Sequence, residues 1–165
     1  MRNNLKALMS ETYLTKDGLV KLQAEHKAML QQKRELTEEV SQAAAMGDLR
    51  ENGEYHAARE RLQHVAKRLA ELDSKLMNVR IIDDLAVKAG EARVGTHVTL
   101  EDLQTKERFS YFLVGPEEAD PQQGKLSMGS PLGKNLLGKK KGEQFKLVLP
   151  RAIVNYRVVS VERSS

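Results

Sequence analysis

The sequence predicts an α+β protein in which a long helical hairpin precedes a small β-sheet domain. Three observations support this prediction: two equal series of apolar residues at heptad spacing, a glycine-bounded break midway between them, and short strand-like runs in the second half. We therefore expect an N-terminal extension at 1–12, a coiled-coil hairpin at 13–84 with its tip at 47–54, and a C-terminal domain at 85–165.

The two heptad series define the arms of the hairpin. Apolar positions alternate spacings of three and four residues from Leu19 to Ala43 and again from Tyr55 to Val79, as along the seam of a coiled coil. Folding the chain back at residue 49 pairs the two arms end to end. Thr15 is the expected N-cap of the first helix. About 30 residues per arm at roughly 1.5 Å each predict a rod on the order of 45 Å long.

His26 and Lys33 are the polar positions of the first series. A role for His26 in metal binding or proton transfer stays open. We favour the interpretation that His26 and Lys33 only weaken the apolar packing of the seam or extend their polar ends toward solvent. The other histidines have no metal-ligand spacing to one another. No metal site held by the protein alone is predicted.

Short runs in the second half predict an antiparallel sheet. Five alternating or β-branched runs are separated by Gly, Pro and acidic clusters; they are THVTL, RFSYFLV, KLSMG, QFKLVLP and IVNYRVVSVE. Between the third and fourth runs, SPLGKNLLG predicts a short helix with Ser130 as N-cap, Pro131 at its first position and Gly138 as C-cap. The lysines at 139–141 are expected to be solvated more readily than bound to phosphate.

Composition narrows the class of protein. The 165 residues include three Phe, four Tyr, no Trp and no Cys, which predicts an aliphatic core and excludes disulfides, thiolate metal sites and a cysteine nucleophile. We find no signal peptide and no run of apolar residues long enough for a membrane span, and expect a cytoplasmic protein without a membrane partner. The net charge of +4 permits a nucleic-acid partner without requiring one.

The stretch AAAMGDLRENGEYHAARERL, residues 43 to 62, lies at the hairpin tip. In one interpretation Asp48 is the N-cap of the second arm and Glu51 its N3 partner, while Gly47, Asn52 and Gly53 make the bend. In the other, Asp48 and Glu51 lie about 5–6 Å apart and share a divalent cation. Spacing alone favours the first, and the two are compatible. Because Mg²⁺ usually combines one or two protein carboxylates with water and substrate phosphate, a partner would have to complete such a site.

The tip sequence GDLRENGEYHAARERL closely resembles the coiled-coil tip motif of the Gre family of bacterial transcript cleavage factors, in particular the GreA type. SPLGKNLLGKKKGEQF, residues 130 to 145, resembles the C-terminal domain of the same family, and the resemblance runs from about 13 to 161. It implies an FKBP-like fold for 85–165. It also implies a factor for bacterial RNA polymerase, which we expect to be monomeric when free.

The resemblance further implies a mechanism. The C-terminal domain would dock at the polymerase rim through Ser130, Pro131 and Leu132, and the rod would enter the secondary channel. There Asp48 and Glu51 would hold a Mg²⁺ shared with the polymerase and stimulate its own cleavage of the backtracked nascent RNA 3′ end. The chain would be a catalytic accessory and not an enzyme by itself.

Four further tip residues are candidates for contacts with RNA, polymerase or one another: Arg50, Asn52, Tyr55 and Arg59. Tyr55 falls on the seam, so packing is its favoured role. Three alternatives stay open: a non-cleaving channel binder that inhibits polymerase, a plain coiled-coil interaction module, and a chaperone or prolyl isomerase that does not need the tip.

Overall fold

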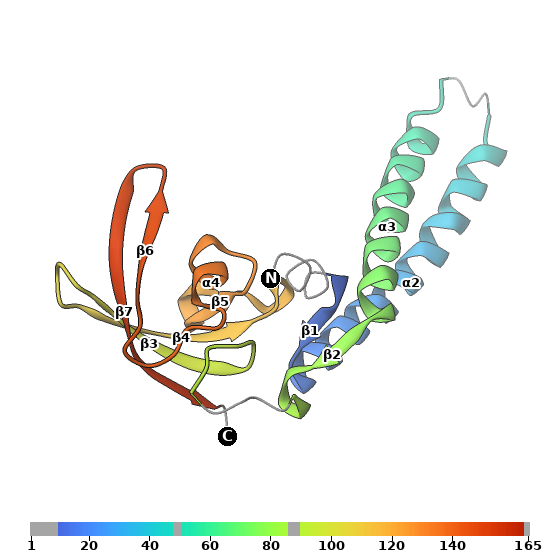
Figure 1. The fold of residues 1–165 in the computed structure, drawn as a ribbon. Helices are drawn as coiled ribbons and strands as arrows, with labels where there is room; N and C mark the ends of the chain where they lie inside the picture. Colours follow the sequence, from blue (N-terminus) through green and yellow to red (C-terminus); the bar gives the residue numbers. More distant parts are fainter. Residues whose placement is uncertain (1–9, 48–50, 86–89, 164–165) are drawn as a thin grey trace. The chain divides into compact units, whose positions relative to one another are not determined.

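The computed structural model describes residues 10–47, 51–85 and 90–163, which form two compact units. The hairpin unit comprises Leu19–Asn78, and the globular unit comprises the described residues up to Gly18 together with those from Val79 onward. The predicted α+β class is confirmed (Figure 1). No helix in the described ranges combines the length and apolarity that a membrane span requires.

Two long helices form the hairpin, α2 (Lys16–Ala45) and α3 (Gly53–Met77). They run side by side in opposite directions (Figure 1). The buried side chains of the hairpin all belong to the two predicted heptad series; they are Leu22, Leu36, Ala43, Ala58, Val65, Leu69 and Leu72. The side chains that pack between the two helices are therefore those at heptad spacing in the sequence, as expected for a coiled coil.

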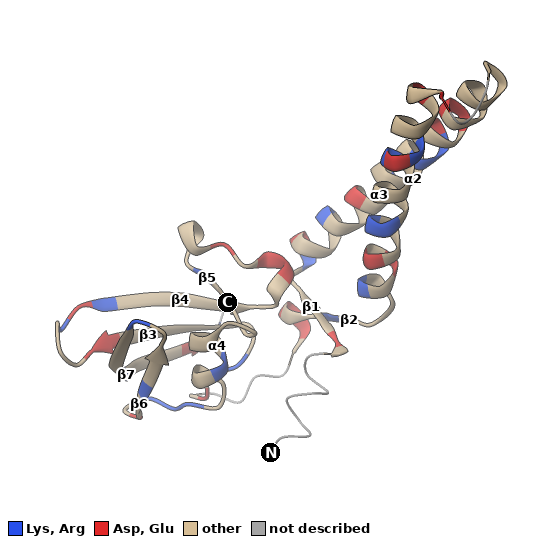
Figure 2. Cartoon of the chain, turned by 90° about the horizontal axis from the view of Figure 1, so that it is seen from above, with Lys and Arg blue, Asp and Glu red and all other residues tan. Residues whose placement is uncertain are grey.

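Basic and acidic residues are interspersed along the hairpin (Figure 2). Ion pairs between described residues join the helices, among them Arg61 Nη2 to Glu39 Oε1 at 2.6 Å, Arg68 Nη2 to Glu25 Oε1 at 2.7 Å, and His26 Nε2 to Asp73 Oδ1 at 2.6 Å. His26 is half-buried and Lys33 is exposed. The His26 contact is with one carboxylate from the opposite helix, so its observed role is to pair the two arms.

The base of the hairpin differs from the prediction. The second heptad series ends before Val79, because α3 stops at Met77 and Val79 begins β2 (Val79–Ile81). This strand pairs in parallel with β1 (Thr12–Leu14), with Thr12 opposite Val79. An apolar residue at a heptad position fits a helix and a strand equally well, and here the hydrogen bonds to β1 decide.

The start of α2 is capped twice. Thr15 is the N-cap as predicted, because its Oγ1 accepts from Gly18 N at 3.0 Å. Its own backbone N–H and hydroxyl donate to the carboxylate of Glu118, at 2.7 and 2.6 Å. A carboxylate is favoured at this positive end of a helix. Glu118 lies 103 residues away along the chain, so sequence spacing gave no signal for this contact.

The globular unit is built on a five-stranded sheet of order β5-β4-β3-β7-β6. Its strands are β3 (Thr96–Asp102), β4 (Arg108–Val114), β5 (Lys125–Ser127), β6 (Gln144–Leu149) and β7 (Ala152–Arg163). All five predicted strands are present. The sheet is antiparallel as predicted in its β3–β4, β3–β7 and β6–β7 pairings, but β4 and β5 are parallel, which the prediction did not include.

The reason lies in the connection after β4. Two short 3₁₀ turns, Pro116–Glu118 and Pro121–Gln123, fill the Gly-, Pro- and acid-rich segment between the second and third predicted strands. They carry the chain back so that Gly124 O accepts from Phe112 N at 2.8 Å, and β5 then starts beside the middle of β4. A connection of this length allows the parallel direction that a tight hairpin turn excludes.

One face of the sheet packs against the short helix α4 (Pro131–Leu136). The core between them is aliphatic as predicted, with fully buried Val98, Leu100, Leu113, Leu136 and Val158. At the start of α4, Ser130 Oγ accepts from Gly133 N at 3.0 Å. Gly138, at φ +83°, follows the C-cap Leu137, in the left-handed conformation that glycine adopts without strain.

Candidate functional site

The hairpin apex is the segment between the two helices. The structure describes Met46, Gly47, Glu51 and Asn52 there, whereas Asp48 and Arg50 lie outside the described residues. Gly47 has φ +153°, a backbone conformation that favours glycine over residues with a Cβ. The chain therefore leaves α2 through a position that requires a glycine, as the sequence break at this residue predicted.

Asn52 caps the second helix. Its Oδ1 accepts from Tyr55 N at 3.2 Å, and α3 begins at Gly53. The predicted cap at Asp48 with Glu51 at N3 is therefore wrong, because the helix starts after both residues. Asn and Asp are about equally good N-caps, but Asn52 also makes a bond that a carboxylate cannot make: its Nδ2 donates to Ala43 O at 2.8 Å.

Glu51 lies in the turn immediately before the cap, and its side chain is exposed. It stands close to the N-terminus of α3, where the exposed backbone N–H groups favour an anionic group. Glu54 adds a second exposed carboxylate in the first turn of the helix. The described part of the apex is therefore acidic and open to solvent.

The remaining predicted tip residues differ in exposure. Tyr55 is half-buried and packs edge-on against the ring of His56, at a centroid distance of 5.4 Å. Arg59 is exposed. Just below the apex, Ala43 and Ala58 are both buried, 7% and 0% exposed. The two helices therefore remain packed up to the last turn of α2 and the first turns of α3.

The chemistry of these side chains fits a shared Mg²⁺ site. Carboxylate oxygens are the ligands that this cation prefers, and an exposed Glu51 leaves room for water and for ligands from a second molecule. Within residues 10–47, 51–85 and 90–163, no three His, Asp or Glu side chains gather in a way that could hold a metal ion.

The three residues predicted to contact polymerase lie at the start of α4. Pro131 is exposed, whereas Leu132 is half-buried and packs against the core of the globular unit. Ser130 is half-buried and, besides capping the helix, donates from its hydroxyl to Ser127 O at 2.7 Å. Ser130 and Leu132 thus have structural roles, and Pro131 presents the most accessible surface of the three.

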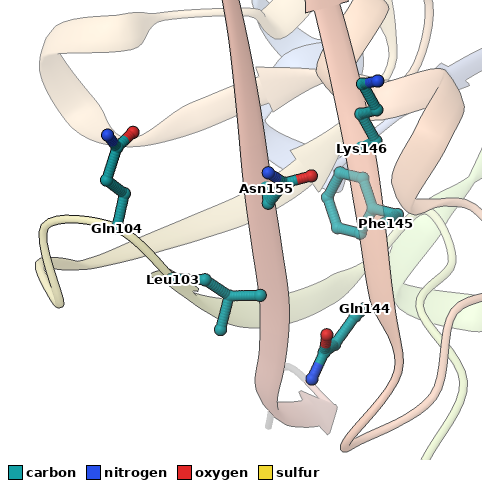
Figure 3. Close-up of a pocket in the computed structure, with 6 residues that line it drawn as sticks. All are labelled: Leu103, Gln104, Gln144, Phe145, Lys146 and Asn155. Atoms are coloured by element: carbon teal, nitrogen blue, oxygen red, sulfur yellow. The ribbon is translucent and has the colours of Figure 1, made fainter.

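A shallow groove, which the sequence did not predict, crosses β6 and β7 (Figure 3). The side chains of Leu103, Gln104, Gln144, Phe145, Lys146 and Asn155 line it. Three primary amides and an ammonium group make this lining predominantly polar. A prolyl isomerase pocket requires an apolar, aromatic lining, and this groove does not provide one.

The described features define a class of two-part protein, in which a helical hairpin with an acidic apex is joined at its base to a small globular unit. The chain belongs to the GreA/GreB family of transcription elongation factors. Residues 12–81 match the family model described as transcription elongation factor, N-terminal. Residues 87–163 match the one described as transcription elongation factor, GreA/GreB, C-term.

Individual relatives match this chain over nearly its whole length. The chain is 38% identical over 156 residues to transcription elongation factor GreA of Chloroherpeton thalassium, covering 94% of this chain and 99% of that protein. It is 39% identical over 151 residues to GreA of Chlorobium phaeobacteroides, with 90% and 95% covered. Among solved structures, the GreA factor homolog 1 protein of Thermus thermophilus is 29% identical at a TM-score of 0.42, covering 92% of this chain and 99% of that one.

Proposed function

We propose that this chain is an elongation factor that binds bacterial RNA polymerase, inserts its hairpin apex into the secondary channel, and stimulates cleavage of backtracked RNA. The observation that carries the proposal is the exposed carboxylate of Glu51 beside the Asn52 cap, at the far end of a long two-helix rod. Membership of the GreA/GreB family supports the same assignment. The factor acts as a monomer in the cytoplasm.

The chain's own part in the reaction is to deliver and orient carboxylates. Glu51 extends from the apex into a partner's active centre, and Asp48, three residues earlier, is its proposed companion. Together they accept hydrogen bonds from the attacking water and hold it in line with the scissile RNA phosphodiester. A Mg²⁺ ion bound between these carboxylates and the polymerase would lower the pKa of that water and stabilise charge on the phosphate oxygens.

The remaining predicted residues assist without reacting. Pro131, with Ser130 and Leu132 behind it, docks the globular unit on the outside of the polymerase. Arg50 and Arg59 contact the extruded RNA or the channel wall through their guanidinium groups. Because the chain supplies only part of a metal site, it is a catalytic accessory and has no nuclease activity alone.

The test uses a stalled, backtracked bacterial elongation complex with 3′-labelled RNA and Mg²⁺. We expect wild-type protein to release short 3′ fragments, and Asp48→Ala and Glu51→Ala each to reduce release to the polymerase-only rate while still competing with wild type for binding. Glu60→Ala is the matched control, since Glu60 is also an exposed glutamate on the hairpin. We expect it to cleave within twofold of wild type.

Two results would contradict the proposal. If wild type binds but yields no fragments beyond the polymerase-only rate, the chain is a channel inhibitor and not a cleavage factor. If Glu60→Ala loses as much activity as Glu51→Ala, the loss reflects the charge of the rod and not the position of the carboxylate at its apex.

A further inference from the structure

The two sides of the apex are joined by one side chain. Asn52 Nδ2 donates to Ala43 O in the last turns of α2 at 2.8 Å, while Asn52 Oδ1 accepts from Tyr55 N in the first turn of α3 at 3.2 Å. The Asn52 backbone oxygen also accepts from His56 N at 3.2 Å. The residue is therefore fixed to both helices by its side chain and to α3 by its backbone as well.

The first of these bonds spans nine residues. Ala43 O also accepts from Met46 N at 3.2 Å, at the end of its own helix, so the amide of Asn52 is a second donor to this carbonyl and comes from the opposite arm. A cap alone requires only an acceptor, which Ser, Thr or Asp would also provide. Capping α3 and bonding to α2 at the same time requires an acceptor and a donor on separate atoms that together reach both backbones, as the Oδ1 and Nδ2 of Asn52 do; the single short hydroxyl of serine does not extend that far.

We propose that Asn52 is a positioning residue, which ties the ends of the two helices together and so fixes the backbone from which the adjacent Glu51 extends. This inference rests on the proposed function, because it assigns Asn52 a role in orienting that carboxylate. Productive geometry for an in-line reaction tolerates little displacement. A loose apex still binds polymerase through the rest of the molecule, but it presents Glu51 in many orientations.

The substitution Asn52→Ser separates the two bonds. Serine keeps the N-cap acceptor and is neutral like asparagine, but it lacks the amide group that reaches Ala43 O. Asn78→Ser is the matched control, since Asn78 is the C-cap residue at the opposite end of the same helix. A second variant, Asn52→Asp, keeps the size and the cap, and also lacks the donor.

The first measurement follows cleavage of backtracked RNA against factor concentration and against Mg²⁺ concentration. We expect Asn52→Ser to keep the half-saturating factor concentration within twofold of wild type, to lower the maximal cleavage rate about threefold to tenfold, and to raise the half-saturating Mg²⁺ concentration severalfold. Asn78→Ser should match wild type in all three. Equal maximal rates for Asn52→Ser and wild type would overturn the inference.

The second measurement does not depend on cleavage. Because the chain has no cysteine, nitroxide labels can be attached at Ala45→Cys and Glu54→Cys, two exposed positions on opposite arms near the apex. Electron paramagnetic resonance of the free protein should give a broader distance distribution with Asn52→Ser or Asn52→Asp than with Asn52 or with Asn78→Ser. If the distance distribution of the Asn52 variants is as narrow as that of wild type, Asn52 does not tie the helices together, even if the variants cleave more slowly. If the variants give a broader distribution but the wild-type protein releases no RNA fragments, the tie is retained and the proposed function is refuted.

Discussion

Replacing Gly133 by alanine should destabilise the globular unit. Gly133 is buried in α4, and a Cβ built on it would lie 2.0 Å from Ser127 O and 3.0 Å from Met128 Cα. Both neighbours are backbone atoms, so no side chain can rotate away. Ser127 O also accepts hydrogen bonds from the backbone N–H and hydroxyl of Ser130, at 3.1 and 2.7 Å, and any displacement of the carbonyl strains both.

The sign of the effect follows from two opposing terms. Alanine is preferred over glycine inside a helix by about 1 kcal/mol, whereas overpacking a well-filled site costs about 1–3 kcal/mol and occasionally more. Because the overlap is with rigid backbone, the cost lies at or beyond the upper end of that range. We expect a net loss of about 2 kcal/mol, which lowers the urea midpoint by about 1 M for a typical denaturant slope.

The aromatic residues give an assay specific to this unit. Tyr13, Tyr111 and Tyr156 belong to the globular unit and Tyr55 to the hairpin, and the chain has no tryptophan. Tyrosine fluorescence during urea unfolding therefore reports mainly on the globular unit, while circular dichroism at 222 nm reports mainly on the long helices. Gly133→Ala should lower the fluorescence midpoint.

Gly53→Ala is the matched control. Gly53 begins α3, and its added Cβ would meet no atom within 4 Å. The helix preference then acts unopposed, and we expect the hairpin to gain up to about 1 kcal/mol. A Gly133→Ala protein as stable as wild type by fluorescence would show that the backbone around Ser127 yields readily, and would refute the argument from contact distance.

Three further predictions concern other contacts. Burial and the hydrogen bond to Glu11 raise the pKa of Tyr13 to about 12 from 10.0. The neutral phenol therefore stabilises the globular unit fully below pH 10, and the free energy of unfolding should fall as the pH rises through 12. In Tyr13→Phe, which has no phenol to ionise, that fall should be less steep. Leu72→Ala removes a fully buried side chain and should cost the hairpin about 2–5 kcal/mol by circular dichroism, with a loss below 1 kcal/mol arguing against a packed seam. Arg68→Ala breaks a partly exposed pair with Glu25 and should cost at most about 1 kcal/mol, a difference that should shrink in 1 M salt.

Much of the fold could be predicted from periodicity. The run RFSYFLV coincides with β4 at Arg108–Val114, and the heptad series identify the buried face of both helices. These features depend on which face of an element is apolar, and a single sequence records that directly. Strand direction does not alter the period-two pattern, which is why the parallel pairing of β4 and β5 could not be predicted.

The apex was predicted less well than the arms. Asp48 and Asn52 are equally plausible caps by residue type, and the spacing of the acidic residues favoured Asp48. Asn52 caps the helix because it also bonds to Ala43 O across the hairpin, and such a contact depends on how closely the two helices approach. A single sequence does not record which backbone groups meet across the hairpin, so it could not distinguish Asn52 from Asp48.

The pairing of β1 with β2 has a consequence for how the protein is made. The ribosome synthesises Thr12–Leu14 before the whole hairpin, but its partner strand Val79–Ile81 follows the hairpin, and the main sheet comes later still. The two helices contact each other locally and can form as soon as both have left the ribosome. The backbone groups of β1 remain unpaired until β2 has been synthesised. An early-folding hairpin brings residues 12 and 79 together, so it shortens the search that β1 would otherwise face.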